Sequence, residues 1–497
     1  MSANVEKTQD TSNPYYQNMR YGGQEAWTQD RKEEIEFSEK FKVEKKWKDV
    51  WASVLFFISL FGFIYISGVS IHEFLNTAEY KKKDFSKTSS FTINLNTIFL
   101  YVYVVGSAAA LSFLYFLFAR IYTKQFIWST GILQIVFMLG IGIFFLIRGL
   151  YTASIVFLIF AIFYGFCFYT WRSRIPLATM YLQFTMKVCS YFPSVYFISF
   201  FGMVVSIGFF AWFFITLLAS FTKFSEYGPD GFRKQSCIDN PDKCNSMYLH
   251  LIIFYLFFNA YWITEVIKNV IHTTICGIFG SYYYGYNTPE GIPKHAALAS
   301  FKRTTTYSFG SVCFGSLVAS IVQILRDIFK SIMRDRAGSG DIIGTIFSCF
   351  ASCVLILLDW LVQYFNHYCY AQIALYGKKY LRAAKDTWDM FRRTGIDALI
   401  NDCLIDNVLF FGSLFVACLT AFSSYLYLRF TNPQYNNNGS YYIGVIFISF
   451  FIGLQVCNIA VVPIKSGIAA LFVGVSEDRE VLRRNFPLLY NQMFGAV

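Results

Sequence analysis

One apolar stretch of the sequence contains four side chains with polar groups, namely Trp262, Glu265, Asn269 and His272. Spacings of three and four residues place them within roughly an 80° arc of one helical face. A carboxylate supplies negative charge, an indole ring attracts a cation through its face, and an imidazole can carry a proton near neutral pH. The pattern predicts a binding face for a small cation. The alternative is that these groups hydrogen-bond to neighbouring helices, or that Glu265 and Lys268 simply lie at the edge of a membrane.

A second polar face has spacings of four, three and four residues and consists of Asp359, Gln363, Asn366 and Tyr370. These side chains also stack along one side of a helix. Asp359 is the acid deepest in any apolar block and is therefore a second candidate for contacting a cation. Its alternative role is a hydrogen bond between helices. Whether the two faces form one site stays open at this point.

The composition shows what must surround these groups. The 497 residues are 55% hydrophobic and 20% aromatic, and only 15% are charged. Soluble chains carry roughly 25% charged residues, so a soluble enzyme, a disordered chain and a coiled coil are excluded. The formal net charge of +11 indicates basic loops that face anionic lipid, and it does not indicate a nucleic-acid partner.

The apolar residues fall into blocks of about 20 or more residues, the length that crosses a bilayer as a helix. We expect an all-α, polytopic membrane bundle with ten transmembrane helices, because backbone groups in lipid must be satisfied within the segment. Continuously apolar blocks exclude a transmembrane barrel. The expected spans are Trp51–His72, Thr97–Phe118, Ile127–Ile147, Gly149–Trp171, Ser194–Ala219, Met247–Lys268, Thr305–Ile328, Ile342–Phe365, Cys403–Leu428 and Tyr441–Pro463.

An even number of spans puts both termini on one side, and the lysines that flank the first span favour the cytosol. Residues 1–46 read as a disordered cytosolic tail, 47–464 as the transmembrane domain and 465–497 as a cytosolic segment. The expected outer loops are 73–96, 220–246 and 429–440. Residues 371–401 carry six Lys and Arg among regularly spaced apolar residues, which predicts a basic amphipathic helix on the cytosolic leaflet or a seat for a partner protein.

The expected outer loops carry two modification candidates. Cys237 and Cys244 are close in sequence and would face an oxidising compartment, which indicates a disulfide. Asn438 begins an N-x-S/T sequon hard against the last span. No phosphate-binding loop, serine nucleophile elbow or zinc-protease motif is present in the sequence. We therefore expect no enzymatic activity, no cofactor and no metal.

Several small or acidic residues carry local predictions. A helix from Met247 to Tyr284 would be about 57 Å long, so we expect a kink or break near Gly277 or an interfacial continuation. Gly310-Ser311 and Gly315-Ser316 predict close helix packing. Asp402 and Asp406 fall at the expected start of the ninth span, where carboxylates complement the helix dipole.

Three motifs together resemble the choline transporter-like family. They are Asn366-x3-Tyr370-x3-Ala374-x-Tyr376-Gly377-x6-Ala384-Lys385, Ser300-Phe301-x-Arg303-Thr304 followed by the two Gly-Ser pairs, and the run Trp262–Tyr284. The segment Lys45–Trp51 and the end Phe486-Pro487-x2-Tyr490 are similar to the fungal branch. The resemblance implies ten spans, cytosolic termini, a plasma-membrane location and transport of choline or a related quaternary amine. The short loop Glu73–Asn96 lacks the cysteine-bearing domain of animal members, which weakens transfer of their substrate.

The functional hypothesis is a facilitative carrier that moves a small organic cation across the bilayer by alternating access. Glu265 and Asp359 would supply charge, Trp262 an aromatic face, and Asn269, His272, Gln363 and Asn366 polar contacts. One alternative is a proton-coupled exchanger or channel that uses His272. Another is a non-transporting scaffold or sensor that acts through residues 1–46 and 371–401. A lipid-modifying enzyme would need a cytosol-facing acid–base cluster, and the sequence offers no convincing one. The oligomeric state stays open.

Overall fold

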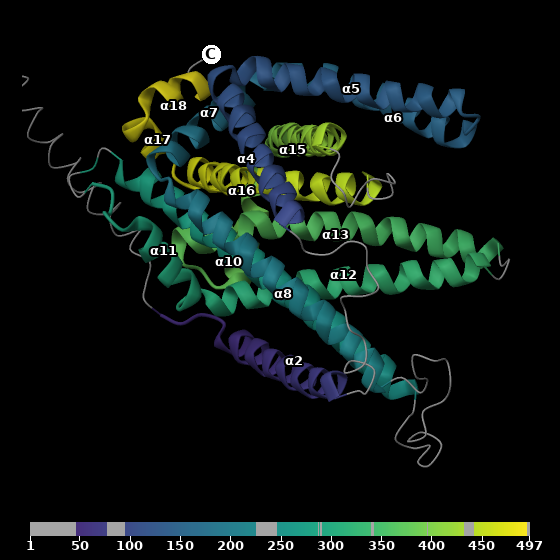
Figure 1. Cartoon of the computed structure of the whole chain (residues 1–497). Coiled ribbons are helices and arrows are strands. Elements are labelled where there is room, and N and C mark those ends of the chain that lie inside the picture. The colour runs from purple at the N-terminus through teal and green to yellow at the C-terminus, as the bar shows by residue number, and fades with distance from the viewer. Residues whose placement is uncertain are drawn as a thin grey trace, which may run out of the picture.

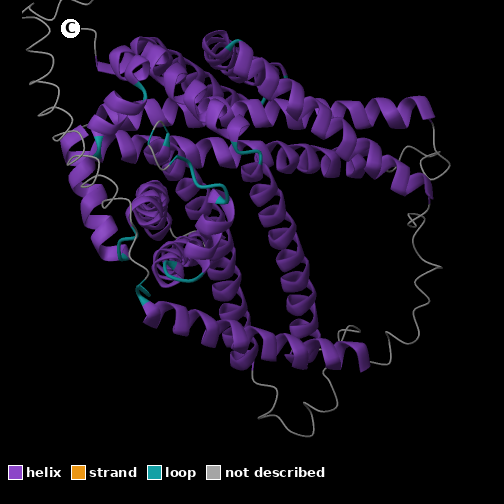
Figure 2. Ribbon diagram, turned by 90° about the vertical axis from the view of Figure 1, so that its left-hand side faces the viewer, coloured by secondary structure: helices purple, strands orange, loops and turns teal. Residues whose placement is uncertain are grey.

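Helices form nearly all of the computed structural model, which describes residues 46–76, 95–224, 246–286, 288, 291–338, 342–394, 396–431 and 442–494 (Figures 1 and 2). No strand occurs in these ranges. Nine helices of the described residues are long and apolar enough to cross a membrane. The prediction of a polytopic helical bundle is confirmed.

The long helices are α2 (Val50–Asn76), α4 (Leu95–Ile121), α5 (Thr123–Ile147), α6 (Tyr151–Trp171), α8 (Ser194–Phe224), α10 (Ser246–Gly285), α12 (Phe309–Gly338), α13 (Ile342–Tyr376), α15 (Ile396–Thr431) and α16 (Tyr442–Glu477). The shorter ones are α7 (Ile175–Tyr191), α11 (Ala296–Thr305), α14 (Tyr380–Thr394), α17 (Arg479–Asn485) and α18 (Pro487–Phe494). The eighth expected span is α13, which lies along α12 although it is not among the nine selected by hydropathy (Figure 1).

Both described ends of the chain lie at one end of the bundle, on the left of Figure 1. The Lys48 backbone N–H donates to the Tyr307 carbonyl at 3.1 Å. From α17, Asn485 Nδ2 donates to the Tyr283 carbonyl at 2.9 Å. We call this the terminus-bearing end. An even number of crossings requires this arrangement, and assigning this end to the cytosol stays a prediction.

Helix α10 is continuous over 40 residues, so the break expected near Gly277 is wrong. Glycine in a helix interior costs only about 1 kcal/mol, which tertiary packing readily overrides. A Cβ at Gly277 would overlap Ser300 Oγ of α11, and that hydroxyl donates to the Thr274 carbonyl at 2.7 Å. The glycine therefore serves the close approach of α11. The last part of α10 is buried in the protein at the terminus-bearing end.

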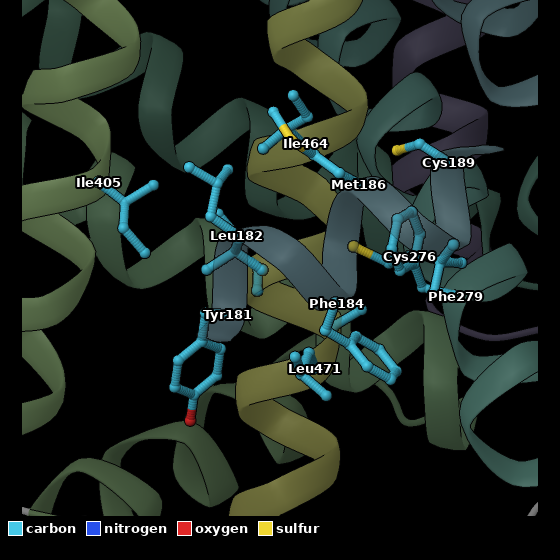
Figure 3. Packing of buried hydrophobic residues seen from close by; sticks show 14 of the residues in the cluster. Tyr181, Leu182, Phe184, Met186, Cys189, Cys276, Phe279, Ile405, Ile464 and Leu471 are labelled. Carbon is cyan, nitrogen blue, oxygen red and sulfur yellow. The ribbon is translucent and has the colours of Figure 1, made fainter. Parts of the chain in front are cut away.

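Helix α7 is a buried element that the sequence analysis did not assign. Pro176 lies in its first turn, where a missing N–H costs nothing. The labelled side chains of Figure 3 show how α7 inserts between its neighbours: Leu182, Phe184 and Met186 lie among residues of α10 and α16. Its shorter, more mixed apolar pattern distinguishes it from the membrane-spanning blocks, and it fills the core of the terminus-bearing end.

The chain before α2 forms hydrogen bonds with two other helices, α12 and α14. Asp49 adopts a left-handed conformation, with φ of 50°. Its Oδ2 accepts hydrogen bonds from Ser311 Oγ of α12 at 2.6 Å and from the Tyr380 backbone N–H at 2.9 Å. A carboxylate that receives the first N–H of a helix acts as its N-cap, so Asp49 caps α14 from a distant part of the chain.

Gly310 makes that docking possible. A Cβ at Gly310 would overlap the backbone carbonyls of Lys48 and Asp49, and backbone cannot rotate away. We expect Gly310→Ala to lower the free energy of unfolding by about 1–3 kcal/mol, measured by thermal unfolding in detergent. Gly106→Ala is the control, since no described atom lies within 4 Å of a Cβ there. Equal stability of the two variants would contradict the prediction.

Two local predictions are corrected. Helix α15 begins at Ile396, so Asp402 and Asp406 lie beyond its first turn. Asp406 instead pairs with Lys465 Nζ at 3.0 Å. The segment 371–401 is not one helix: α13 runs to Tyr376, Gly377 follows with φ of 60°, and α14 and α15 are separate. Cys237, Cys244 and Asn438 lie outside the described residues.

Candidate functional site

Three neighbouring helices, α10, α12 and α13, turn polar faces toward one another. The face of α12 comprises Ser316, Ser320, Gln323 and Asp327, and it repeats the four-three-four spacing of the α13 face. Close packing of α12 against α13 and α14 depends on a small residue: a Cβ at Gly315 would overlap the Tyr370 hydroxyl of α13 and the Tyr380 ring of α14. The expected role of Gly315-Ser316 in helix packing therefore agrees with the structure.

Glu265 lies at the centre of these faces and is buried. Its Oε1 is 2.7 Å from Lys268 Nζ, one turn along the same helix. The same oxygen accepts from Gln323 Nε2 at 2.9 Å and from Gln363 Nε2 at 3.4 Å, while Oε2 accepts from Asn269 Nδ2 at 3.3 Å. The carboxylate is thus neutralised by an internal cation and held by donors from three helices.

Asn269 extends the network toward the terminus-bearing end. Its Nδ2 lies 3.0 Å from Ser316 Oγ and 3.2 Å from the Tyr370 hydroxyl. Asn366 lies in the next layer, where its Oδ1 accepts from the Tyr380 hydroxyl at 2.6 Å. Tyr380 belongs to α14, and burial raises the pKa of its hydroxyl above the ordinary value, so it stays a donor. Asn366 therefore joins α13 to α14 and does not contact Glu265.

Asp359 is the second buried acid. One of its oxygens, Oδ2, accepts from Arg326 Nη1 of α12. Within the described part of the chain, the other oxygen, Oδ1, is buried with no hydrogen-bond partner. Arg326 Nε also lies 3.3 Å from Asp327 Oδ1, and Asp327 accepts from the Tyr261 hydroxyl of α10. Arg326 therefore neutralises Asp359 through Oδ2, while Oδ1 has no hydrogen-bond partner among the described residues.

The two predicted faces meet through α12. Gln323, which donates to Glu265, is one turn from Arg326, which binds Asp359. Gln363 likewise lies one turn from Asp359 on α13 and accepts from Lys268 Nζ at 3.0 Å. The Lys268 side chain is 52% exposed whereas that of Glu265 is 8% exposed. The two acids thus lie one helical turn apart along α12 and α13, in adjoining parts of one polar region that we call the network, and this region reaches the surface of the bundle at Lys268.

His272 lies apart from this network, against α16. Its ring stacks on the His367 ring, with centroids 4.0 Å apart. Nε2 lies 2.8 Å from the His367 carbonyl, which can only accept, so Nε2 carries a proton. Nδ1 lies 2.8 Å from Ser466 Oγ. His272 therefore joins α10, α13 and α16, and it does not contact Glu265 directly.

Trp262 lies in an apolar cluster instead of facing the acids. Its indole N–H donates to the Cys313 carbonyl of α12 at 3.1 Å. Phe56 of α2 packs against the ring, with centroids 5.4 Å apart and an interplanar angle of 81°. In this arrangement the ring anchors α10 to α2 and α12, so the predicted cation-facing indole surface is occupied by apolar neighbours.

The sequence analysis missed the residues of α12 and the internal cations. Gln323, Arg326 and Asp327 lie near the end of an apolar block, where charged groups read as membrane flanks. The signal that identifies them is the spacing of Ser316, Ser320, Gln323 and Asp327, which matches that of the α13 face. The described residues include no group of three or more His, Cys, Asp or Glu suited to hold a metal ion.

Comparison of the sequence with known proteins identifies the family of this chain. A sequence model described as "Plasma-membrane choline transporter" matches residues 155–480. "Protein PNS1" of Yarrowia lipolytica is 42% identical over 459 residues, which cover 92% of this chain and 80% of that protein. "Protein PNS1" of Saccharomyces cerevisiae is 38% identical over 468 residues, 93% of this chain and 86% of that one. The family predicted from the motifs is confirmed, and the chain belongs to the choline transporter-like family of multi-pass membrane proteins.

Proposed function

We propose that the protein is a facilitative plasma-membrane carrier for a small organic cation, choline or a related amine. The observation that carries the proposal is the buried Glu265 carboxylate, already paired at 2.7 Å with a half-exposed lysine. Charged groups at bilayer depth are costly and tend to mark the path of a solute. Family membership supports the same class of solute.

The geometry suggests an exchange of cations at Glu265. The Lys268 side chain is long and 52% exposed, so its ammonium group can turn away from Glu265 toward the surface of the bundle. An incoming ammonium group would then take its place beside the carboxylate. Asn269, Gln323 and Gln363 would keep the carboxylate oriented during the exchange, because all three already donate to it.

Alternating access also needs a closure that can open. At the terminus-bearing end, Tyr376 OH donates to Asp478 Oδ2 at 2.8 Å and lies 2.6 Å from Tyr284 OH. Tyr284 donates to the same carboxylate oxygen, and Tyr283 OH donates to the Asp478 carbonyl at 3.0 Å. Hydrogen bonds among these four residues connect α10 and α13 to the residue that follows α16. We propose that this conformation is closed at that end and that transport requires these hydrogen bonds to break.

Purified protein in liposomes tests the proposed activity. We expect uptake of labelled choline, or of another small quaternary or tertiary amine in a panel, above that of protein-free liposomes. Uptake should saturate and should be inhibited by an excess of the unlabelled amine. Glucose and an amino acid of zero net charge serve as controls. Saturable uptake of a neutral solute in preference to every amine would contradict the proposal.

A second candidate function, proton-coupled exchange, is favoured by one observation: the imidazole rings of His272 and His367 stack at 4.0 Å beside the network. Each imidazole ring has a nitrogen that can bind or release a proton. The same liposomes distinguish the two functions. Facilitative uptake continues when the pH is equal on both sides, whereas uptake that requires a pH gradient supports exchange.

A further inference from the structure

A pocket of about 320 Å³ lies at the terminus-bearing end, away from the polar network of α10, α12 and α13. It is formed by α7 with the preceding Arg174, the end of α14, the end of α16, and α17 and α18; of these, α7, α17 and α18 lie at the upper left of Figure 1. Its volume is within the range typical of small-ligand sites, which begins at about 300 Å³. Nothing in the proposed transport cycle uses it.

The charge on the pocket is of one sign. Arg174, Arg393 and Arg479 converge on it from three separate elements, and its described lining includes no acid. Arg393 Nη2 contacts Glu477 Oε1 at 2.9 Å, but this side chain is 61% exposed and can turn. The Arg479 guanidinium lies over the Phe494 ring, 4.4 Å from its centroid, which holds it at the rim.

The rest of the lining is apolar or aromatic. Phe472, Val475 and Met493 contribute to the wall, together with Tyr181 and Leu177 of α7. In Figure 3 the Tyr181 ring extends away from the other labelled core residues of α7. A ligand that fits therefore combines an anionic group with an apolar part next to it. Arginine binds phosphate through paired hydrogen bonds, and a phosphate monoester offers three terminal oxygens to several guanidinium groups.

We propose that this pocket binds a phosphate-bearing amphiphile at the terminus-bearing end of the protein. The three arginines hold the phosphate and the aromatic wall holds the adjoining carbon chain. The phosphate can belong to the headgroup of a membrane lipid or to a soluble phosphate ester. Binding there competes with Glu477 for Arg393. Glu477 also accepts from Gln372 of α13 at 3.3 Å, so an occupant that displaces Glu477 acts on α13 only through that side chain.

The test measures binding to purified full-length protein in detergent by microscale thermophoresis. The probes are dioctanoyl phosphatidic acid, dioctanoyl phosphatidylcholine and glycerol 3-phosphate. We expect phosphatidic acid to bind and the zwitterionic lipid to bind at least tenfold more weakly. Binding of phosphatidic acid without binding of glycerol 3-phosphate assigns the site to a lipid, whereas comparable binding of both means that the arginines recognise phosphate alone and contradicts the role given to the apolar wall. Failure of both phosphate probes to bind overturns the proposal.

Matched variants locate the site. Arg174→Gln and Arg479→Gln should each weaken binding about tenfold or more, because each removes a charged hydrogen-bond donor. Arg483→Gln is the control: it loses the same charge from the same short helix, but Arg483 is 65% exposed and lies 3.5 Å from Glu480. Leu177→Trp fills the pocket without changing its charge and should also abolish binding. Equal effects of Arg479→Gln and Arg483→Gln, with full binding by Leu177→Trp, would mean non-specific surface attraction.

Discussion

Replacing Glu265 by glutamine is expected to reduce the uptake of labelled choline by about 30-fold or more, since a charged hydrogen bond contributes about 2 kcal/mol. The amide has nearly the shape of the carboxylate but carries no charge. It also removes the charge that holds Lys268 Nζ at 2.7 Å, so neither this lysine nor an incoming ammonium group is attracted to the position. The measurement is initial uptake rate against substrate concentration, normalised to the protein at the cell surface.

Asp406→Asn is the matched control for that experiment. Asp406 is also an acid paired with a lysine, 3.0 Å from Lys465, but it bridges α15 and α16 outside the network. Its substitution should leave uptake within about twofold, because partly exposed ion pairs contribute about 1 kcal/mol or less. Unaltered uptake kinetics in Glu265→Gln would remove Glu265 from the transport site, whatever the control shows.

Removing the cation that neutralises Asp359 should have the largest effect on folding. Arg326→Met leaves a buried carboxylate without its partner, and its Oδ1 already has none among the described residues. We expect the free energy of unfolding to fall by about 3–5 kcal/mol, as for other buried pairs broken on one side. Thermal unfolding of purified protein in detergent measures this. Lys330→Met, which removes a 43% exposed lysine 4.0 Å from Asp327, should change stability little.

The double variant Arg326→Met/Asp359→Leu then separates stability from transport. Replacing both members of a buried pair by apolar residues is often neutral or stabilising, so stability should return to near that of the unchanged protein. If Asp359 contacts the substrate, uptake should stay low. Recovery of stability together with full uptake would assign Asp359 to a purely structural hydrogen-bonding role.

The sequence predicts the crossing helices well because continuous apolar runs of sufficient length have one stable arrangement in lipid. It predicts their ends less well. Helix α10 continues through Gly277 to Gly285 because α7, α11 and α16 bury its last turns. Helix α7 itself was not recognised, since its burial comes from protein neighbours and its composition is more mixed than that of a lipid-facing block.

The sequence predicts which face of each helix carries the polar residues, but it does not predict which residues they contact. Periodicity places Glu265, Asn269 and Trp262 on one side of α10, yet it does not say which neighbour each side chain meets. Trp262 packs against Phe56, a residue far away in sequence, and so leaves the network. Glu265 meets a lysine one turn away, a contact that the spacing of three residues does allow. Only the packing of α12 against both helices brings Arg326 to Asp359.

The internal pairing of both acids has an electrical consequence. The Glu265–Lys268 and Arg326–Asp359 pairs each sum to zero, so an empty carrier that changes conformation moves no net charge from them across the membrane voltage. A monovalent cation that displaces Lys268 adds its own charge to the loaded form. A potential of 100 mV, negative inside, is worth about 2.3 kcal/mol per charge, or roughly 50-fold accumulation. Such a carrier would concentrate its substrate on voltage alone, without a coupled ion.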